Sequence, residues 1–254
     1  MDLLRLSVLV VGLLSVGVAR AAPVRLAAED WPPYVTSALP GNGLTGAMIS
    51  AVLERLGDTL DVDYFPWKRT VEYGLHNPLY AGYMAVWRTP ERDKLCYFSS
   101  PVGRTQSVIA YLKEAPVRAS TLTDLRELRV GVVGGYANGD EFDALVHSGV
   151  LHVEEGVNDS ANLRKLLSHR FSVMVIEKHV LRYLLASPEF REARDRIAIS
   201  TELFHERTVH VCFKRTAEGQ ALQQAFDEAA RKLNMNRIER DYWSRLGYDA
   251  ADEN

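Results

Sequence analysis

Short apolar runs alternate along this chain with segments in which apolar residues recur every three or four positions. Runs such as Val24–Ala28 and Ala81–Val86 predict buried strands, whereas Gly46–Leu56 places Met48, Ile49, Val52, Leu53 and Leu56 on one face of a helix. This alternation predicts an α/β fold whose crossover connections are long enough for parallel strand pairing. Further strands are expected at 62–64, 108–112, 129–133, 153, 172–176 and 209–213, and further helices at 67–73, 141–147, 161–169, 178–185, 218–233 and 237–245.

The alternating pattern falls into two runs, and the second begins near Ser107. No repeat, low-complexity tract or flexible linker separates the runs. Two lobes without a flexible linker predict domains that are joined by extended hinge strands. In such folds a ligand lies in the crevice between the lobes, at the carboxyl ends of strands.

The first 21 residues have the pattern of a cleavable signal peptide. Arg5 precedes the 13-residue apolar stretch Leu6–Val18, which is too short to span a bilayer comfortably. Ala19-Arg20-Ala21 then fits a small-x-small cleavage site. We therefore expect export to the periplasm and a mature chain that begins at Ala22; the alternative is an uncleaved anchor.

Composition and charge exclude several function classes. The 254 residues are 47% hydrophobic and 25% charged, which is ordinary for a globular protein, and the net charge is −3. Basic residues are spread along the chain, so no nucleic-acid surface is expected. The seven histidines are scattered and no C-x-x-C motif occurs, so we expect neither a metal site nor a cofactor.

The two cysteines, Cys96 and Cys212, both lie in apolar, strand-like surroundings. Export makes a disulfide chemically possible, but sequence alone does not give the distance between the two residues. The pattern favours two buried free thiols, with a disulfide as the open alternative.

Several short motifs occur in an order and spacing that resemble the family 3 periplasmic solute-binding proteins, the polar amino-acid type of ABC transporters. The resemblance covers essentially the whole mature chain. It implies a two-lobed periplasmic binding-protein fold of type II, with lobe 1 from 22–103 and 209–254, lobe 2 from 104–208, and two hinge strands near 103–107 and 205–209. The motifs are Glu29–Tyr34, Gly46 at a helix start, Pro66–Arg69, Thr89–Arg92, Phe98–Pro101, Leu125–Val133 and Arg170–Glu177.

The same resemblance assigns charged ligand contacts. The Arg of the Thr-x-x-Arg pattern, here Arg92, grips the ligand carboxylate in the family, because the guanidinium fork matches a carboxylate with two parallel bonds. Glu177 stands where the family commonly has an Asp that holds the ligand amino group. The alternatives are a surface Arg92 beside Glu91 and Asp93, and a Glu177 that only caps a helix.

Aromatic residues complete the expected site. Trp31 and Trp67 match positions where family members place rings above and below the ligand. Trp87 stands where amino-acid binders often carry a hydroxyl, although Thr89 keeps its own. This departure argues against a standard α-amino acid and fits equally a smaller, an aromatic or a non-amino carboxylate. The turn 134–139 is expected to be either an anion cradle or a plain turn.

These features favour a non-catalytic, monomeric binding protein that captures a small carboxylate-bearing solute, such as an amino acid, for an ABC permease. One alternative is a cyclohexadienyl-dehydratase-like enzyme on the same scaffold, with Glu177 as general acid. Another is a sensor that presents its ligand to a membrane receptor. The sequence does not separate transport from sensing.

Overall fold

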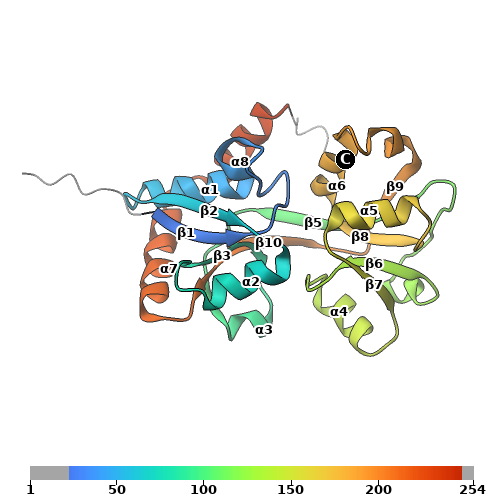
Figure 1. The fold of residues 1–254 in the computed structure, drawn as a ribbon, viewed down its shortest axis with the longest axis horizontal. Coiled ribbons are helices and arrows are strands. Elements are labelled where there is room, and N and C mark those ends of the chain that lie inside the picture. The colour runs from blue at the N-terminus through green and yellow to red at the C-terminus, as the bar shows by residue number, and fades with distance from the viewer. Residues whose placement is uncertain (1–22, 248–254) are drawn as a thin grey trace, which may run out of the picture.

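The computed structural model describes residues 23–247 as two lobes joined by two long strands (Figure 1). The predicted signal peptide 1–21 and its cleavage site lie outside the described residues. The expected α/β architecture is confirmed, and most expected helices and strands occur within a few residues of their predicted limits. The short strand at Ile197–Ser200 is one that the sequence analysis missed.

The first lobe is built on a sheet in which parallel and antiparallel strands meet. Strand β1 (Pro23–Ala28) pairs in parallel with β2 (Thr59–Tyr64) and with β3 (Gly82–Trp87). Strand β10 (Glu206–Lys214) lies antiparallel to β3 and to β4 (Cys96–Phe98), so its late residues join the sheet of β1 as expected. The helical elements here are η1 (Pro40–Asn42), α1 (Gly43–Glu54), α2 (Trp67–His76), α3 (Pro90–Asp93), α7 (Ala217–Ala230) and α8 (Met235–Arg245).

The second lobe is built on a second sheet of five strands. Strand β6 (Arg129–Val133) pairs in parallel with β7 (His152–Gly156) and β8 (Val173–Glu177). Strand β5 (Arg104–Leu112) lies antiparallel to β8 and to β9 (Ile197–Ser200). The helical elements are η2 (Leu122–Leu125), α4 (Asp140–His147), α5 (Asp159–Leu167), α6 (Lys178–Ala186) and η3 (Arg191–Arg196).

The two lobes are connected where β5 and β10 cross between the sheets (Figure 1). At this crossing Arg104–Gln106 pairs antiparallel with Glu206–Thr208. Each strand then continues into a separate sheet, β5 in the second lobe and β10 in the first. These are the two hinge strands that the family resemblance implied; the lobe limits 22–103 with 209–254 and 104–208 stay a prediction.

The hydrophobic pattern of α1 explains how the first lobe packs. Met48, Ile49, Val52 and Leu53 are all buried in the main core, as their spacing predicted. The helix begins at Gly43, three residues before the expected start. Gly43 has φ +86, and a Cβ there would lie 2.5 Å from the carbonyl oxygen of Tyr34, so the turn into this helix requires glycine.

Cys96 and Cys212 form a disulfide, so the expectation of two free thiols is wrong. The antiparallel pairing of β4 with β10 brings their Cα atoms to 5.5 Å, within the usual range for a disulfide. The sequence did not reveal this contact because it depends on the pairing of two strands whose cysteines are 116 residues apart.

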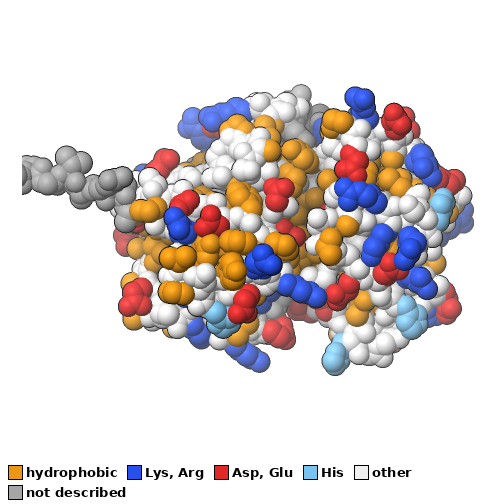
Figure 2. Space-filling view, viewed as in Figure 1, with side chains coloured by type: hydrophobic (Ala, Val, Ile, Leu, Met, Phe, Trp, Pro, Cys, Tyr) orange, Lys and Arg blue, Asp and Glu red, His pale blue; other side chains and the backbone are white. Residues whose placement is uncertain are grey.

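The surface has no dominant charge on the face drawn in Figure 2, where acidic and basic side chains are interspersed on both lobes. Within residues 23–247 no helix is long and apolar enough to cross a membrane. The same residues contain no group of three or more His, Cys, Asp or Glu side chains arranged to hold a metal ion.

Candidate ligand-binding site

A pocket of about 390 Å³, including the part that is open to solvent, lies between the lobes. The space within it that can hold the centre of a water molecule is only about 30 Å³, so the lining side chains fill most of the pocket in this closed form. Its walls come from the ends of β1, β3 and β6 and from the starts of α2 and α3, at the carboxyl ends of strands. The lining residues are Glu29, Trp31, Trp67, Met84, Ala85, Trp87, Arg92, Tyr136 and Ala137.

Arg92 lies in the pocket wall at the end of a short capped helix. The hydroxyl of Thr89 accepts from the backbone N–H of Arg92 and so begins α3. The guanidinium donates to the carbonyl oxygen of Trp87 at 3.0 Å and to that of Gly135 at 3.4 Å, and lies 5.3 Å from the ring centre of Trp67. Burial lowers the pKa of Arg92, and among the described residues no carboxylate forms an ion pair with it.

The three indole rings have their polar edges satisfied by groups around the pocket. Trp31 donates to the carboxyl group of Asp159 at 3.2 Å, and Trp67 donates to the carbonyl oxygen of Gly135 at 2.8 Å. Trp87 donates to the hydroxyl of Thr105 at 2.8 Å. Because these N–H groups are engaged, the rings offer the pocket their apolar, electron-rich surfaces.

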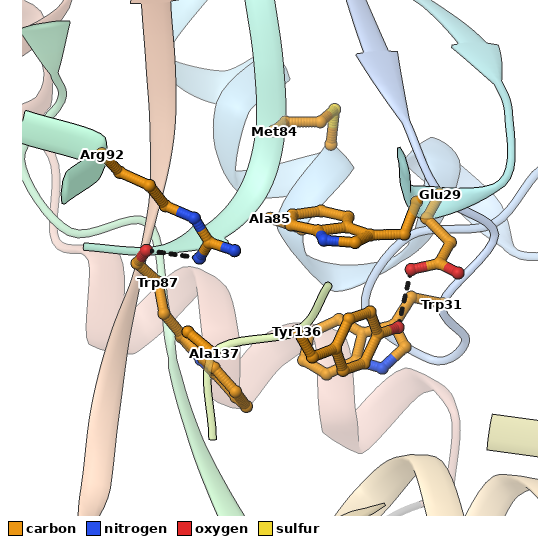
Figure 3. A pocket seen from close by; sticks show the side chains of 9 residues that line it. Glu29, Trp31, Met84, Ala85, Trp87, Arg92, Tyr136 and Ala137 are labelled. Carbon is orange, nitrogen blue, oxygen red and sulfur yellow. Dashed lines mark hydrogen bonds between the residues drawn. The ribbon is translucent and has the colours of Figure 1, made fainter. Parts of the chain in front are cut away.

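Glu29, at the carboxyl end of β1, is a pocket residue that the sequence analysis missed. It is 8% exposed, and its Oε2 accepts from the phenol of Tyr136 at 2.6 Å. Burial raises the pKa of Glu29 to about 8, and the nearby carboxyl group of Asp159 adds to this rise. Figure 3 shows Glu29 and Arg92 on opposite sides of the pocket. The signal was present in the Glu29-Asp30-Trp31 motif, but only Trp31 was interpreted as a ligand contact.

Of the six predicted ligand contacts, the pocket brings together Arg92, Trp31, Trp67 and Trp87. Thr89 does not line the pocket and caps α3. Glu177 also lies outside the lining.

Glu177 is fully engaged at the start of α6. Its carboxylate accepts from the backbone N–H groups of His179 at 2.7 Å and Val180 at 2.9 Å, which caps the helix. It also accepts from the backbone N–H of Gln106 and from the hydroxyl of Tyr34. Burial raises the pKa of Glu177 to about 7. The structure therefore gives this residue the helix-capping role that the sequence analysis kept as an alternative.

Asp159 lies in the first turn of α5 but does not cap this helix. The side chain of Asn158 caps this helix, accepting from the backbone N–H of Ala161 at 2.8 Å. Asp159 is instead buried against Trp31, and burial raises its pKa to about 7. Its first-turn position directs the carboxyl group towards the other lobe rather than along its own helix.

The turn after β6 brings carbonyl oxygens to the pocket. The backbone N–H groups of Gly134, Tyr136 and Asn138 bind Gly156, Val133 and Asp143 respectively. The carbonyl oxygen of Gly135 accepts from both Trp67 and Arg92. These bonds fit the plain-turn alternative, and through Gly135 the segment offers an acceptor to the opposite lobe; the choice between a plain turn and an anion cradle stays a prediction.

Ala85 has a strained backbone at the pocket wall. It has φ +59, and the register between β3 and β10 shifts at this point. A non-glycine residue in the left-handed region costs about 1–3 kcal/mol. A bulge of this kind changes the direction of neighbouring side chains, and residues 84, 85 and 87 all line the pocket.

Direct hydrogen bonds across the pocket hold the lobes together. They join Tyr136 to Glu29, Trp31 to Asp159, and Trp67 to Gly135. Such bonds between separately folded sheets describe a closed arrangement, in which a bound solute would contact both lobes at once.

The sequence matches no protein-family model and no curated protein. Solved structures do match. An ancestral arginine-binding protein bound to arginine has TM-score 0.72 and 16% identity, covering 89% of this chain and 98% of that chain. The GluR0 ligand-binding core from Nostoc punctiforme, in complex with L-glutamate, has TM-score 0.71 and 16% identity, covering 89% and 100%. The amino-acid ABC transporter substrate-binding protein AbpA from Streptococcus pneumoniae, bound to L-arginine, has TM-score 0.69 and 16% identity, covering 88% and 94%. This chain therefore has the two-lobed fold of the periplasmic binding proteins.

Proposed function

We propose that this chain is a periplasmic solute-binding protein that captures a small carboxylate-bearing solute between its lobes and delivers it to an ABC importer. Residues 1–21 direct export and are then removed, and the protein acts as a monomer without catalysis. Arg92 is the observation that carries this proposal, because it is a half-buried cation in the pocket wall that forms no ion pair with a carboxylate of the described residues.

The guanidinium of Arg92 has the geometry and the spare donors to hold a carboxylate. It has five N–H donors, and two of them bind the backbone carbonyl oxygens of Trp87 and Gly135. Partial burial makes this charge costly, and the nearby carboxylates of Asp143 and Glu91 form no ion pair with it. A solute carboxylate with two parallel bonds compensates for that cost. Neighbours of the same fold hold arginine and glutamate, which both carry a carboxylate.

Closure gives this binding a readout that an importer can recognise. A solute that contacts Arg92 on one lobe and the Tyr136 turn on the other stabilises the closed form in proportion to its differential affinity for it. Delivery to an importer is proposed over presentation to a receptor because structural neighbours include substrate-binding proteins of amino-acid ABC transporters.

The test begins with a thermal-shift screen of amino acids and small carboxylates, because a ligand that binds only the folded state raises the melting temperature. Calorimetry on Arg92→Ala should then show binding weakened by roughly 30-fold or more, since removing one partner of a buried charge pair costs about 2–5 kcal/mol. Arg92→Lys should also bind poorly, because lysine lacks the fork.

Arg88→Ala is the matched control. Arg88 is the same residue type four positions away, but it pairs with Asp93 at the surface and does not line the pocket. Its removal should leave affinity unchanged. Near-wild-type affinity in Arg92→Ala would refute the proposed role of Arg92, and a folded protein that binds no carboxylate would refute the proposed function.

A second candidate function rests on Glu29. A carboxyl group with a pKa of about 8 is largely protonated at neutral pH, and in this pocket it faces Arg92. That is the protonation state a general acid needs to donate a proton to a leaving hydroxyl group. Turnover of cyclohexadienyl acids such as prephenate, lost in Glu29→Gln, would favour the enzyme over the binding protein.

A further inference from the structure

Three backbone carbonyl oxygens at the pocket already accept hydrogen bonds from side chains of the protein. The carbonyl oxygen of Trp87 accepts from Arg92, and that of Gly135 accepts from Trp67 and Arg92. The carbonyl oxygen of Ala137 accepts from the guanidinium of Arg207 at 3.0 Å. The family resemblance expected a hydroxyl at position 87 and an amine contact at Glu177, but residue 87 is tryptophan and Glu177 caps a helix.

A primary ammonium group is poorly matched to these surroundings. It brings three N–H donors that must all find acceptors when water is excluded. Among the lining side chains, Glu29 is the acidic one, and it already accepts from the hydroxyl of Tyr136 and the backbone N–H of Trp67. A cation bound beside it favours its charged form over the protonated form that it has in the empty pocket. A fully methylated ammonium group has no N–H donors, so the same pocket leaves none of its groups unsatisfied.

The aromatic residues suit such a cation. Trp31, Trp67 and Tyr136 line the pocket with Glu29, and Trp67 meets Tyr136 edge to face with ring centres 5.5 Å apart. Cations are attracted to the faces of such rings, and cages of aromatic residues bind quaternary ammonium groups in this way. Met84, Ala85 and Ala137 supply apolar contacts for methyl groups.

Trp87 has a different part in this arrangement. The guanidinium of Arg207 lies 4.4 Å from the centre of its ring, so one face already holds a cation. Trp87 meets Trp31 edge to face, with ring centres 6.2 Å apart. It therefore closes the Arg92 end of the pocket. The guanidinium of Arg92 likewise lies 5.3 Å from the ring centre of Trp67, so a second cation at the Glu29 end would contact Trp31, Tyr136 and the ring surface of Trp67 that Arg92 leaves open.

We propose that the solute is a small carboxylate that carries a fully methylated ammonium group. Its carboxylate binds Arg92, and its methylated cation lies against Trp31, Trp67 and Tyr136 beside Glu29. This inference rests on the proposed function, and it adds the chemical class of the ligand and a role for Glu29 in selecting it.

Three probes of related shape separate the possibilities. Trimethylglycine has both charges and three N-methyl groups, and glycine has the same charges without the methyl groups. Its isostere 3,3-dimethylbutanoate keeps the carboxylate and the shape but has an uncharged carbon in place of the charged nitrogen. Calorimetry at fixed pH should show trimethylglycine binding at least about tenfold more tightly than either of the other two probes.

Glu29→Gln tests whether Glu29 selects the ligand that carries the methylated cation. The ratio of the affinities for trimethylglycine and 3,3-dimethylbutanoate should fall about tenfold in this variant, because the amide keeps the shape but not the charge. A purely structural role would weaken both probes equally and leave the ratio unchanged. Asp30→Asn is the matched control, since Asp30 is the exposed acidic neighbour of Glu29 outside the pocket lining, and its ratio should stay at the wild-type value.

The outcomes separate this inference from the proposed function. Binding of glycine, or of another primary-amine amino acid, more tightly than its trimethyl form would overturn the inference and leave the proposed function intact. Equal binding of 3,3-dimethylbutanoate and trimethylglycine would overturn the cation site in the same way. Binding of no carboxylate at all would overturn both. The three-probe comparison on the wild-type protein decides the ligand class even if Glu29→Gln does not fold.

Discussion

The disulfide between Cys96 and Cys212 should contribute substantially to the stability of this protein. Replacing both cysteines by serine, or reducing the bond, opens a loop of 116 residues that contains the whole second lobe. In the chain-entropy description a loop of this length lowers the entropy of the unfolded chain by about 16 cal/mol/K, which corresponds to about 5 kcal/mol at 25 °C. Measured contributions are typically about 2–4 kcal/mol, so we expect a loss in that range.

Urea unfolding followed by circular dichroism measures this loss. The wild-type protein should unfold at a clearly lower urea concentration when a thiol reductant is present. The double serine variant should unfold at that lower concentration with or without reductant, which shows that the reductant acts through this bond. A thiol assay on the denatured, unreduced protein should find no reactive thiol. Two reactive thiols, or identical midpoints for the oxidised and reduced protein, would refute the reasoning.

Two further predictions concern buried carboxyl groups. Glu29 has Tyr136, Asp159 and Asp30 as neighbours, and its pKa is about 8 in the folded protein against an ordinary value of 4.5. Between pH 4.5 and pH 8 the folded state therefore binds a proton that the unfolded state has released. The free energy of unfolding falls as the pH rises through this range. Melting curves from pH 5 to 8 should therefore show Glu29→Gln gaining stability over wild type, on the order of 1 kcal/mol per pH unit, and a constant difference would contradict this. Glu177→Ala should cost about 1–2 kcal/mol in urea unfolding, because α6 loses its cap, and should leave ligand affinity within a few-fold of wild type. Loss of affinity without loss of stability would return Glu177 to the ligand site.

Features that depend on local pattern were predictable from the sequence. The apolar spacing of α1 gave its buried face, and the family resemblance carried by the Thr89–Arg92 motif placed Arg92 among the ligand-site residues. Features that depend on distant pairing were not predictable. Glu29 becomes a pocket residue with a raised pKa through burial and through Tyr136, which is 107 positions away. The disulfide likewise depends on the pairing of β4 with β10.

Glu177 shows a different limit. The resemblance assigned it to the ligand because an acidic residue at that strand end commonly holds an amine. Its carboxylate turns back onto the first turn of α6, and the hydroxyl of Tyr34 approaches it from the other lobe. Only the three-dimensional contacts distinguish a helix cap from a ligand contact at such a position.

The tryptophans described above make the protein its own optical reporter. Three of the four, Trp31, Trp67 and Trp87, line the pocket, and the fourth, Trp243, stacks on His179 of the opposite lobe with ring centres 5.2 Å apart. Every indole in the chain therefore lies where the lobes meet. Intrinsic fluorescence should change in emission maximum and in quenching by acrylamide when a solute enters, so ligand titrations can be followed without any attached dye.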